Sequence, residues 1–286
     1  MVGLVAGGLL NILGDYVFIN VFNLGIFGAG MSTGISQIIS FIILLIMYIK
    51  MAQSKILFKF ISKNAKDYLN ICRVGLPSLL RQGLTSISNG LLNNLAKPFG
   101  DSAIAAISVI NRFNNLVMCV GLGIGQGFQP VAAFNYQAKE YTRVKKGMLT
   151  TLAIGGCLVF LLSLFGLIIP RQIISIFQDA EEVKNIGEYG LRVASIGVIF
   201  LPISVTVNML YQSIRKSNTA SFLALLRSGL VFIPVLILFA NVWELNGILW
   251  AQPISDIISS LISIPFVIHF LFRTPNTRND EKNIEE

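Results

Sequence analysis

Three polar side chains near the start of the chain have the types and spacing of a cation-binding site. Asp15 lies within a hydrophobic segment, residues 1–22, where an ionised carboxylate is costly unless it is paired, hydrated or protonated. Asn11 lies one helical turn earlier, and Thr33 in the next hydrophobic segment returns to a similar depth, roughly 10 Å below the outer surface. Carboxylate, amide and hydroxyl oxygens suit a proton or sodium, and we expect no other metal. Alternatively, Asp15 serves only helix packing.

A second group of polar side chains predicts either helix–helix contacts or a wet cavity. Gln82, Ser86, Asn89 and Asn93 follow one another at spacings of four, three and four residues, which makes one stripe along a helix. Amides cannot face lipid, so they pair between helices or line a cavity, and both interpretations stay open. The residues expected to line a substrate cavity are Gln82, Asn89, Asn93, Asn111, Asn115, Met118, Asn208 and Met209.

Asp256 is a second acid within a hydrophobic segment. We expect it to pair with an arginine that lies in or near such a segment and to have a structural role. The arginines available are Arg81, Arg112, Arg192 and Arg227. Of these, Arg81 and Arg227 are expected to extend towards the cytoplasmic edge of the membrane.

The composition is that of a membrane protein. The 286 residues are 54% hydrophobic and 13% charged, with a mean hydropathy of +0.72, which excludes an ordinary soluble domain. Crossing a bilayer takes about 20 apolar residues, and long runs without alternation favour helices over a barrel. We therefore predict an all-α polytopic protein with eight transmembrane helices. They lie near residues 1–22, 28–49, 74–97, 102–126, 146–169, 188–213, 219–240 and 247–272.

The charges indicate the topology. Basic residues gather in alternate loops and in the tail, within 50–73, 139–146, 215–216 and 273–282. By the positive-inside rule, both termini are cytoplasmic in a multi-pass protein of the plasma membrane. The net charge of +8 is therefore a topology signal, and we expect no nucleic-acid partner. His269 is the single histidine, and no catalytic or cofactor motif occurs, so we expect neither an enzyme nor a cofactor.

An internal similarity suggests a repeat. Ser36–Ser40 (SQIIS) returns as Ser255–Ser259 (SDIIS), and Gly28 returns as Gly247, both 219 residues later. The predicted organisation is two helices of an N-terminal lobe (1–50), a cytoplasmic amphipathic linker (51–72), a six-helix C-terminal lobe (73–272) and a cytoplasmic tail (273–286). At this offset, a complete first repeat would have about four further helices before Met1.

The sequence GLGIGQGFQP, residues 121–130, has glycine at every second position from Gly121 to Gly127. It lacks the spacing of a nucleotide-binding loop. Because alternate positions cannot share one helical face, the run with Pro130 predicts a flexible or broken half-helix.

Several segments together resemble multidrug and toxic compound extrusion (MATE) transporters of the DNA-damage-inducible and bacterial multidrug export branch. These are Asn11-x-x-x-Asp15, Leu24–Gly25, Gly28–Gly30, Ser36–Gln37, Gly75–Ser78, Ala105–Arg112, the glycine run through Gln129–Pro130, and Asn135–Lys139. The resemblance covers residues 1–272 and implies that the chain corresponds to helices five to twelve of two six-helix lobes. It implies an N-lobe coupling site at Asn11, Asp15 and Thr33. The helix-one Asp that joins this site in the family has no counterpart here.

The resulting expectation is an antiporter that exchanges sodium or protons for drugs and amphiphilic organic cations, with the lipid bilayer as its surroundings. Two alternatives stay open. One is a lipid-linked oligosaccharide flippase of the same superfamily, which would favour a larger, basic cavity. The other is a non-transporting product of a truncated gene, with the missing N-terminal helices expected in a full-length form.

Overall fold

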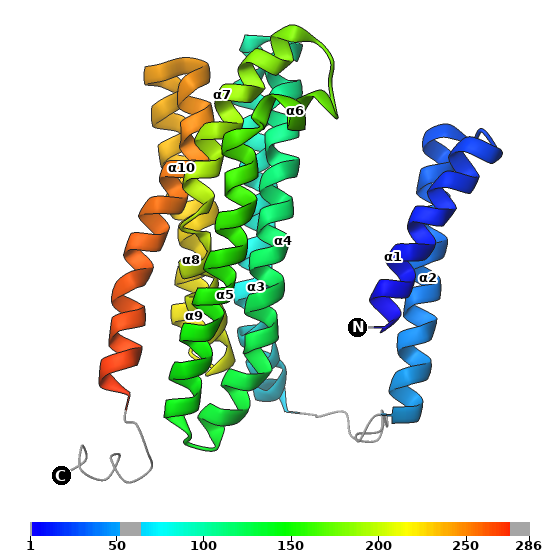
Figure 1. The fold of residues 1–286 in the computed structure, drawn as a ribbon. Coiled ribbons are helices and arrows are strands. Elements are labelled where there is room, and N and C mark those ends of the chain that lie inside the picture. The colour runs from blue at the N-terminus through cyan, green and yellow to red at the C-terminus, as the bar shows by residue number, and fades with distance from the viewer. Residues whose placement is uncertain (1, 52–63, 275–286) are drawn as a thin grey trace. The chain divides into compact units, whose positions relative to one another are not determined.

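The computed structural model describes residues 2–51 and 64–274, and over these residues it contains helices and no strands (Figure 1). The prediction of an all-α protein is therefore confirmed. The chain forms two compact units, Met1–Asn64 and Ala65–Glu286.

The N-terminal unit is a helical hairpin. Its elements are α1 (Val2–Asp15), the π-helical turn η1 (Tyr16–Val21) and α2 (Gly25–Met51). Glycines of α1 let α2 approach closely, since a Cβ at Gly7 would lie 2.7 Å from Ser40 Cβ, and one at Gly14 would lie 2.5 Å from Ser32 Oγ. Such small-residue packing replaces the hydrophobic effect where helices associate in lipid.

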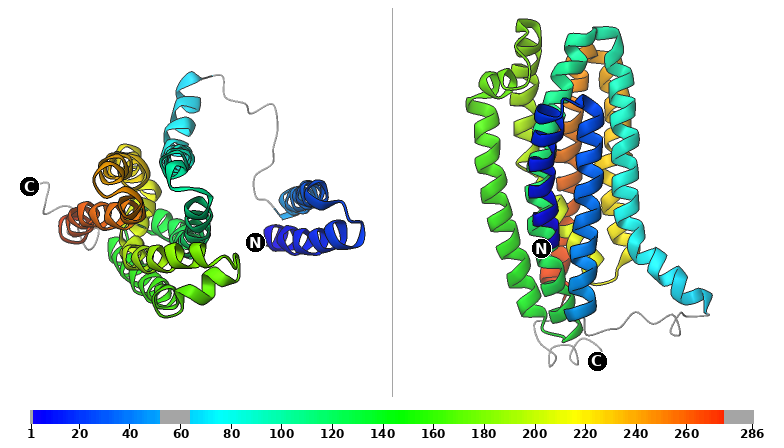
Figure 2. Two further views of the ribbon diagram at one scale, coloured as in Figure 1. Left: turned by 90° about the horizontal axis from the view of Figure 1, so that it is seen from above. Right: turned by 90° about the vertical axis from the view of Figure 1, so that its right-hand side faces the viewer.

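The C-terminal unit is a bundle in which helices distant in sequence pack side by side (Figure 2). Its elements are α3 (Ala65–Ala96), η3 (Lys97–Phe99), α4 (Asp101–Gln137), α5 (Tyr141–Ile168), α6 (Pro170–Ser175), α7 (Glu181–Val198), α8 (Leu201–Ser213), α9 (Ser217–Leu225), η4 (Leu226–Leu230) and α10 (Phe232–Arg273). Two large hydrophobic clusters form most of its core, with two smaller ones beside them. One large cluster contains the fully buried Leu191 and Leu236, and the other contains Met148 and Leu210.

Helix α10 contains a sharp turn. Glu244 has φ 51° and ψ −129°, and Figure 1 shows the chain turning back near this point. The apolar helical stretch around it, Ser217–Phe272, has 56 residues. Unbroken, it would be about 84 Å long, more than twice the hydrocarbon thickness, and the turn divides it into two stretches that are each long enough for one crossing. This agrees with the separate predicted runs 219–240 and 247–272.

The described part of every predicted hydrophobic run lies largely in helix, but the number of spans stays a prediction. Among the described residues, four helical stretches are long and apolar enough to cross a membrane. Helices α7 and α8 make a fifth if the pair, which is bent by 45°, counts as one span. The run 74–97 falls in α3, which is longer than predicted and less apolar, and the run 1–22 is divided by η1.

The boundary between the two units falls inside the predicted linker 51–72. Residues 52–63 lie outside the described part of the chain, and residues 65–72 form the first turns of α3. Most of the predicted tail, 275–286, also lies outside it. The lobe boundaries proposed from the sequence therefore stay predictions.

The prediction of a broken helix at the glycine run is wrong. Helix α4 is continuous through it, because the run provides one packing face. A Cβ at Gly121 would lie 2.6 Å from Leu201 Cδ2, and one at Gly125 would lie 3.0 Å from Met209 Cγ, both in α8. Gly123 and Gly127, on the other side, have nothing within 4 Å.

The two similar segments share local geometry. A Cβ at Gly28 would lie 2.9 Å from the carbonyl oxygen of Phe18, and a Cβ at Gly247 would lie even closer to the carbonyl oxygen of Phe239. Gly25 and Glu244, which are also 219 residues apart, both have positive φ, 53° and 51°. The offset of 219 thus relates the two sequences, the two residues with positive φ and the two closely packed glycines, while the carbonyl groups that these glycines meet are 221 residues apart. The shared turn geometry supports an internal repeat.

Candidate functional site

In the N-terminal unit, a hydrogen-bonded polar group joins α1 and α2. Asn11 Nδ2 donates to Thr33 Oγ1 at 3.3 Å and to Ser32 Oγ at 3.4 Å. Ser32 Oγ donates to the carbonyl oxygen of Asn11 at 3.0 Å, and Thr33 Oγ1 donates to that of Ala29 at 2.9 Å. With both amide hydrogens directed at α2, Asn11 Oδ1 accepts no hydrogen bond within the described residues.

Asp15 lies one turn beyond Asn11, at the end of α1 and directly before the π-helical turn η1. Its Oδ1 is buried and has no hydrogen-bond partner among the described residues. Unsatisfied buried polar atoms are rare in folded proteins, and π-helical turns are frequent at functional sites. An acceptor oxygen of this kind fits a proton or a small cation.

The structure brings Asn11 and Thr33 together, as predicted from their depths, and leaves Asp15 beside them without a direct bond to either. Ser32 was missed by the sequence analysis. Its signal was present, because Gly14 is the small residue of α1 that permits close approach at the depth of Ser32. The role of these residues in coupling stays a prediction.

A polar cavity of about 270 Å³ lies in the C-terminal unit. The predicted residues on its wall are Gln82, Asn89, Asn111, Asn115 and Met118. Asn208 and Met209 line an adjoining pocket, where Asn208 Nδ2 also donates to the carbonyl oxygen of Ala220 at 2.7 Å. Asn93 is exposed and lines neither. The contribution of this set to substrate binding stays a prediction.

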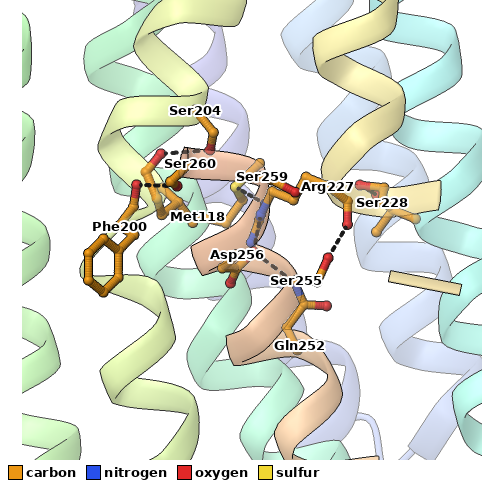
Figure 3. Close-up of polar contacts among 12 residues, drawn as sticks. Met118, Phe200, Ser204, Arg227, Ser228, Gln252, Ser255, Asp256, Ser259 and Ser260 are labelled. Carbon is orange, nitrogen blue, oxygen red and sulfur yellow. Dashed lines mark hydrogen bonds and ion pairs between the residues drawn. The ribbon is translucent and has the colours of Figure 1, made fainter. Parts of the chain in front are cut away.

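A buried ion pair stands at this cavity (Figure 3). Arg227 Nε donates to Asp256 Oδ1 at 2.6 Å, and Gln252 Nε2 donates to the same oxygen at 3.0 Å. Asp256 is 1% exposed and Arg227 16%, and Arg227 Nη1 lies 2.8 Å from Met118 Sδ. The predicted pairing of Asp256 with an intramembrane arginine is confirmed. The expectation that Arg227 extends to the cytoplasmic edge is wrong, because its guanidinium turns to Asp256.

Arg81 lines the same cavity without a carboxylate partner among the described residues. Its one hydrogen bond there is long, 3.4 Å from Nη1 to Asn208 Oδ1, and its buried Nε has no partner. The sequence analysis did not place Arg81 in the cavity, because an arginine that reaches a membrane edge and one that turns inward have the same local sequence.

Comparison with known proteins decides the family. The family model described as MatE matches residues 77–238, more than half of the chain. The chain belongs to the MatE family. This confirms the resemblance found in the sequence.

Two MatE-type relatives are both called multidrug export protein MepA. The protein of Staphylococcus saprophyticus is 24% identical over 271 residues, which cover 93% of this chain and 59% of the relative. That of Staphylococcus aureus strain RF122 is 23% identical over 286 residues, all of this chain and 62% of the relative. The chain thus spans about three-fifths of the length of these relatives.

Solved structures agree on the fold. An outward-facing multidrug resistance MATE family transporter of the MOP superfamily matches with a TM-score of 0.83 at 20% identity, over 93% of this chain and 60% of that one. A mutant of the Vibrio cholerae MATE transporter VcmN matches with a TM-score of 0.82 at 21% identity, over 94% and 61%. These likenesses show that the chain has the fold of these transporters over most of its length.

Proposed function

We propose that this MatE-family chain works in the export of drugs and other amphiphilic compounds across the plasma membrane, in exchange for sodium or protons, with both termini in the cytoplasm. The observation that carries the proposal is the buried, unpartnered Oδ1 of Asp15 beside the Asn11–Thr33 contact. The names of the relatives support efflux of drugs as the activity.

Asp15 would act as the coupling group through its two states. Ionised, it needs a counter-charge, because an isolated carboxylate in an apolar hairpin is strongly disfavoured. A bound sodium ion or a proton satisfies it, with Asn11 Oδ1 and Thr33 Oγ1 as further oxygen ligands for sodium. A cation that binds one conformation better than another shifts the population of conformations by its difference in affinity.

The hydrogen bonds of Asn11 would transmit the effect of cation binding to α2. Thr33 and Ser32 both lie in α2, and both receive a hydrogen bond from Asn11. A cation that recruits the Asn11 amide oxygen or the Thr33 hydroxyl oxygen therefore changes the contacts that join the two helices.

The test uses the wild-type chain in proteoliposomes loaded with a fluorescent amphiphilic dye. An imposed sodium or proton gradient should drive dye efflux, and Asp15→Asn should remove the dependence on the gradient. Glu140→Gln serves as the matched control, because this acid is 57% exposed at the start of α5. Wild-type vesicles without gradient-driven efflux, or an Asp15→Asn protein that keeps it, would overturn the proposal.

A further inference from the structure

We propose that the polar cavity of the C-terminal unit binds an anionic group, a carboxylate or phosphate, carried by an amphiphilic molecule. The inference rests on the proposed function only in calling that molecule a substrate. It changes the expected substrate class from simple organic cations to amphiphiles that carry a negative group, zwitterions included.

The cavity wall has an excess of positive charge. Among the described residues that line it, Arg81 and Arg227 are basic and none is an aspartate or glutamate. Asp256 bonds Arg227 from behind the wall and is 1% exposed, so it balances one guanidinium and does not face the cavity. Two cations and one carboxylate leave one positive charge without a counter-charge in a membrane-spanning bundle, where such a charge marks a functional site.

Hydrogen-bond donors remain available on both arginines. Arg81 has an unpartnered buried Nε and one long contact from Nη1 to Asn208, so most of its donors have no partner among the described residues, and a guanidinium can bind a carboxylate or phosphate. Arg227 directs Nη1 at Met118 Sδ, a weak acceptor that an anionic oxygen would replace with gain (Figure 3). The side-chain amides of Gln82, Asn89 and Asn115 line the same space and can add neutral donors.

The size and the remaining wall fit the headgroup of an amphiphile. A volume of about 270 Å³ holds a small polar group rather than a whole drug-sized molecule. Leu122, Phe232 and Met118 provide apolar contacts beside the arginines. These contacts favour an anion whose apolar part lies along or beyond this wall.

The experiment measures binding and needs no ion gradient. The chain in phosphatidylcholine nanodiscs is loaded with tritiated laurate, which is then displaced by laurate, its neutral analogue lauramide, or dodecyltrimethylammonium. We expect laurate to displace at concentrations about tenfold lower than lauramide, since hydrogen bonds to charged groups are worth at least that factor. Dodecyltrimethylammonium should be the weakest. Equal displacement by all three would overturn the proposal.

Variants tie the preference to the two arginines. Arg81→Gln should abolish the preference for laurate, and Arg81→Lys should retain part of it. Asp256→Asn should strengthen laurate binding, because it frees Arg227 from its counter-charge. Arg192→Gln, a 53% exposed arginine of α7, is the matched control and should bind as wild type. A preference that survives Arg81→Gln in a folded protein contradicts the assignment.

One further comparison distinguishes a lipid headgroup from a soluble amphiphile as the source of the anion, and another distinguishes failure of this site from failure of the proposed function. If nanodiscs of phosphatidylglycerol abolish laurate binding, a lipid headgroup occupies the cavity; if binding persists, the site selects soluble amphiphiles. Both results support an anion site. A protein that binds laurate selectively and exports nothing refutes the proposed function alone. A protein that exports and shows no preference refutes this site alone.

Discussion

The Arg227–Asp256 pair offers a quantitative test of how the C-terminal unit is stabilised. Replacing Arg227 by Gln leaves the Asp256 carboxylate 1% exposed with Gln252 as its one remaining hydrogen-bond donor. Replacing Asp256 by Asn keeps an acceptor oxygen at the position of Oδ1 and removes only the charge. Arg227→Gln therefore leaves a buried charge without a counter-charge, whereas Asp256→Asn leaves the Arg227 guanidinium with its hydrogen bond and without the carboxylate charge.

The magnitudes follow from the geometry. With the charge centres about 4 Å apart and an effective dielectric constant of ~20, the Coulomb attraction is about 4 kcal/mol. Removing one partner of a buried pair costs about 3–5 kcal/mol, and Arg227→Gln should fall in this range. Asp256→Asn should cost about 2 kcal/mol, because its hydrogen bonds survive. The double variant should recover about 2 kcal/mol relative to the sum of the two singles.

Reversible unfolding in mixed micelles, with a titration of sodium dodecyl sulfate and helicity as the signal, gives the free energies of unfolding. Arg171→Gln is the control, since that arginine is 48% exposed and its ion pair with Glu188 should contribute less than 1 kcal/mol. Additive effects in the double variant, or a cost of Arg227→Gln no larger than that of the control, would refute a buried, coupled pair.

Three further predictions concern packing, turn geometry and the cation site. Gly197→Ala should destabilise the C-terminal unit by about 1–3 kcal/mol, because the added Cβ would overlap the backbone of Pro253. Gly123→Ala is the control and should be neutral or stabilising, because nothing lies within 4 Å of its Cβ. Unfolding titrations give the free energies of unfolding of both variants. Glu244→Gly should stabilise the C-terminal unit by about 1 kcal/mol, because glycine adopts a φ of 51° without strain. Glu140→Gly is the control and should not stabilise the protein, because Glu140 has a φ of −89°. Thermal unfolding in detergent compares the two variants. Asn11→Ala should weaken the cation dependence of dye efflux about tenfold relative to the exposed Asn20→Ala, and equal dependence in the two would contradict the site.

The helices could be predicted because lipid leaves a long apolar run no other backbone arrangement. The Asn11–Thr33 contact could be predicted too. A helix rises by about 1.5 Å per residue, so the number of residues between each side chain and the loop that joins the helices gives its depth. Pairing of Asp256 with an arginine followed from the cost of an isolated charge, but the choice among four arginines depended on which helices pack together. Sequence spacing within one helix carries no such information.

The remaining errors have physical causes as well. A glycine run lowers helix propensity, and this favoured a break in α4, but close packing of Gly121 and Gly125 on α8 compensates for that loss. The cavity position of Arg81 was missed, because its contact with Asn208 depends on how its helix packs against α8. Both outcomes depend on tertiary contacts with α8.

The most direct test of the central claim is carbodiimide labelling of Asp15, quantified by mass spectrometry of the membrane-embedded chain. Carbodiimides react with protonated carboxyl groups in apolar surroundings, so Asp15 should be modified at acidic pH. Modification should fall when sodium replaces choline at equal ionic strength, or, for proton coupling, when the pH is raised. Asn11→Ala should weaken any protection by sodium. An Asp15 that is never modified, or is modified regardless of both sodium and pH, would contradict its role as the coupling carboxylate.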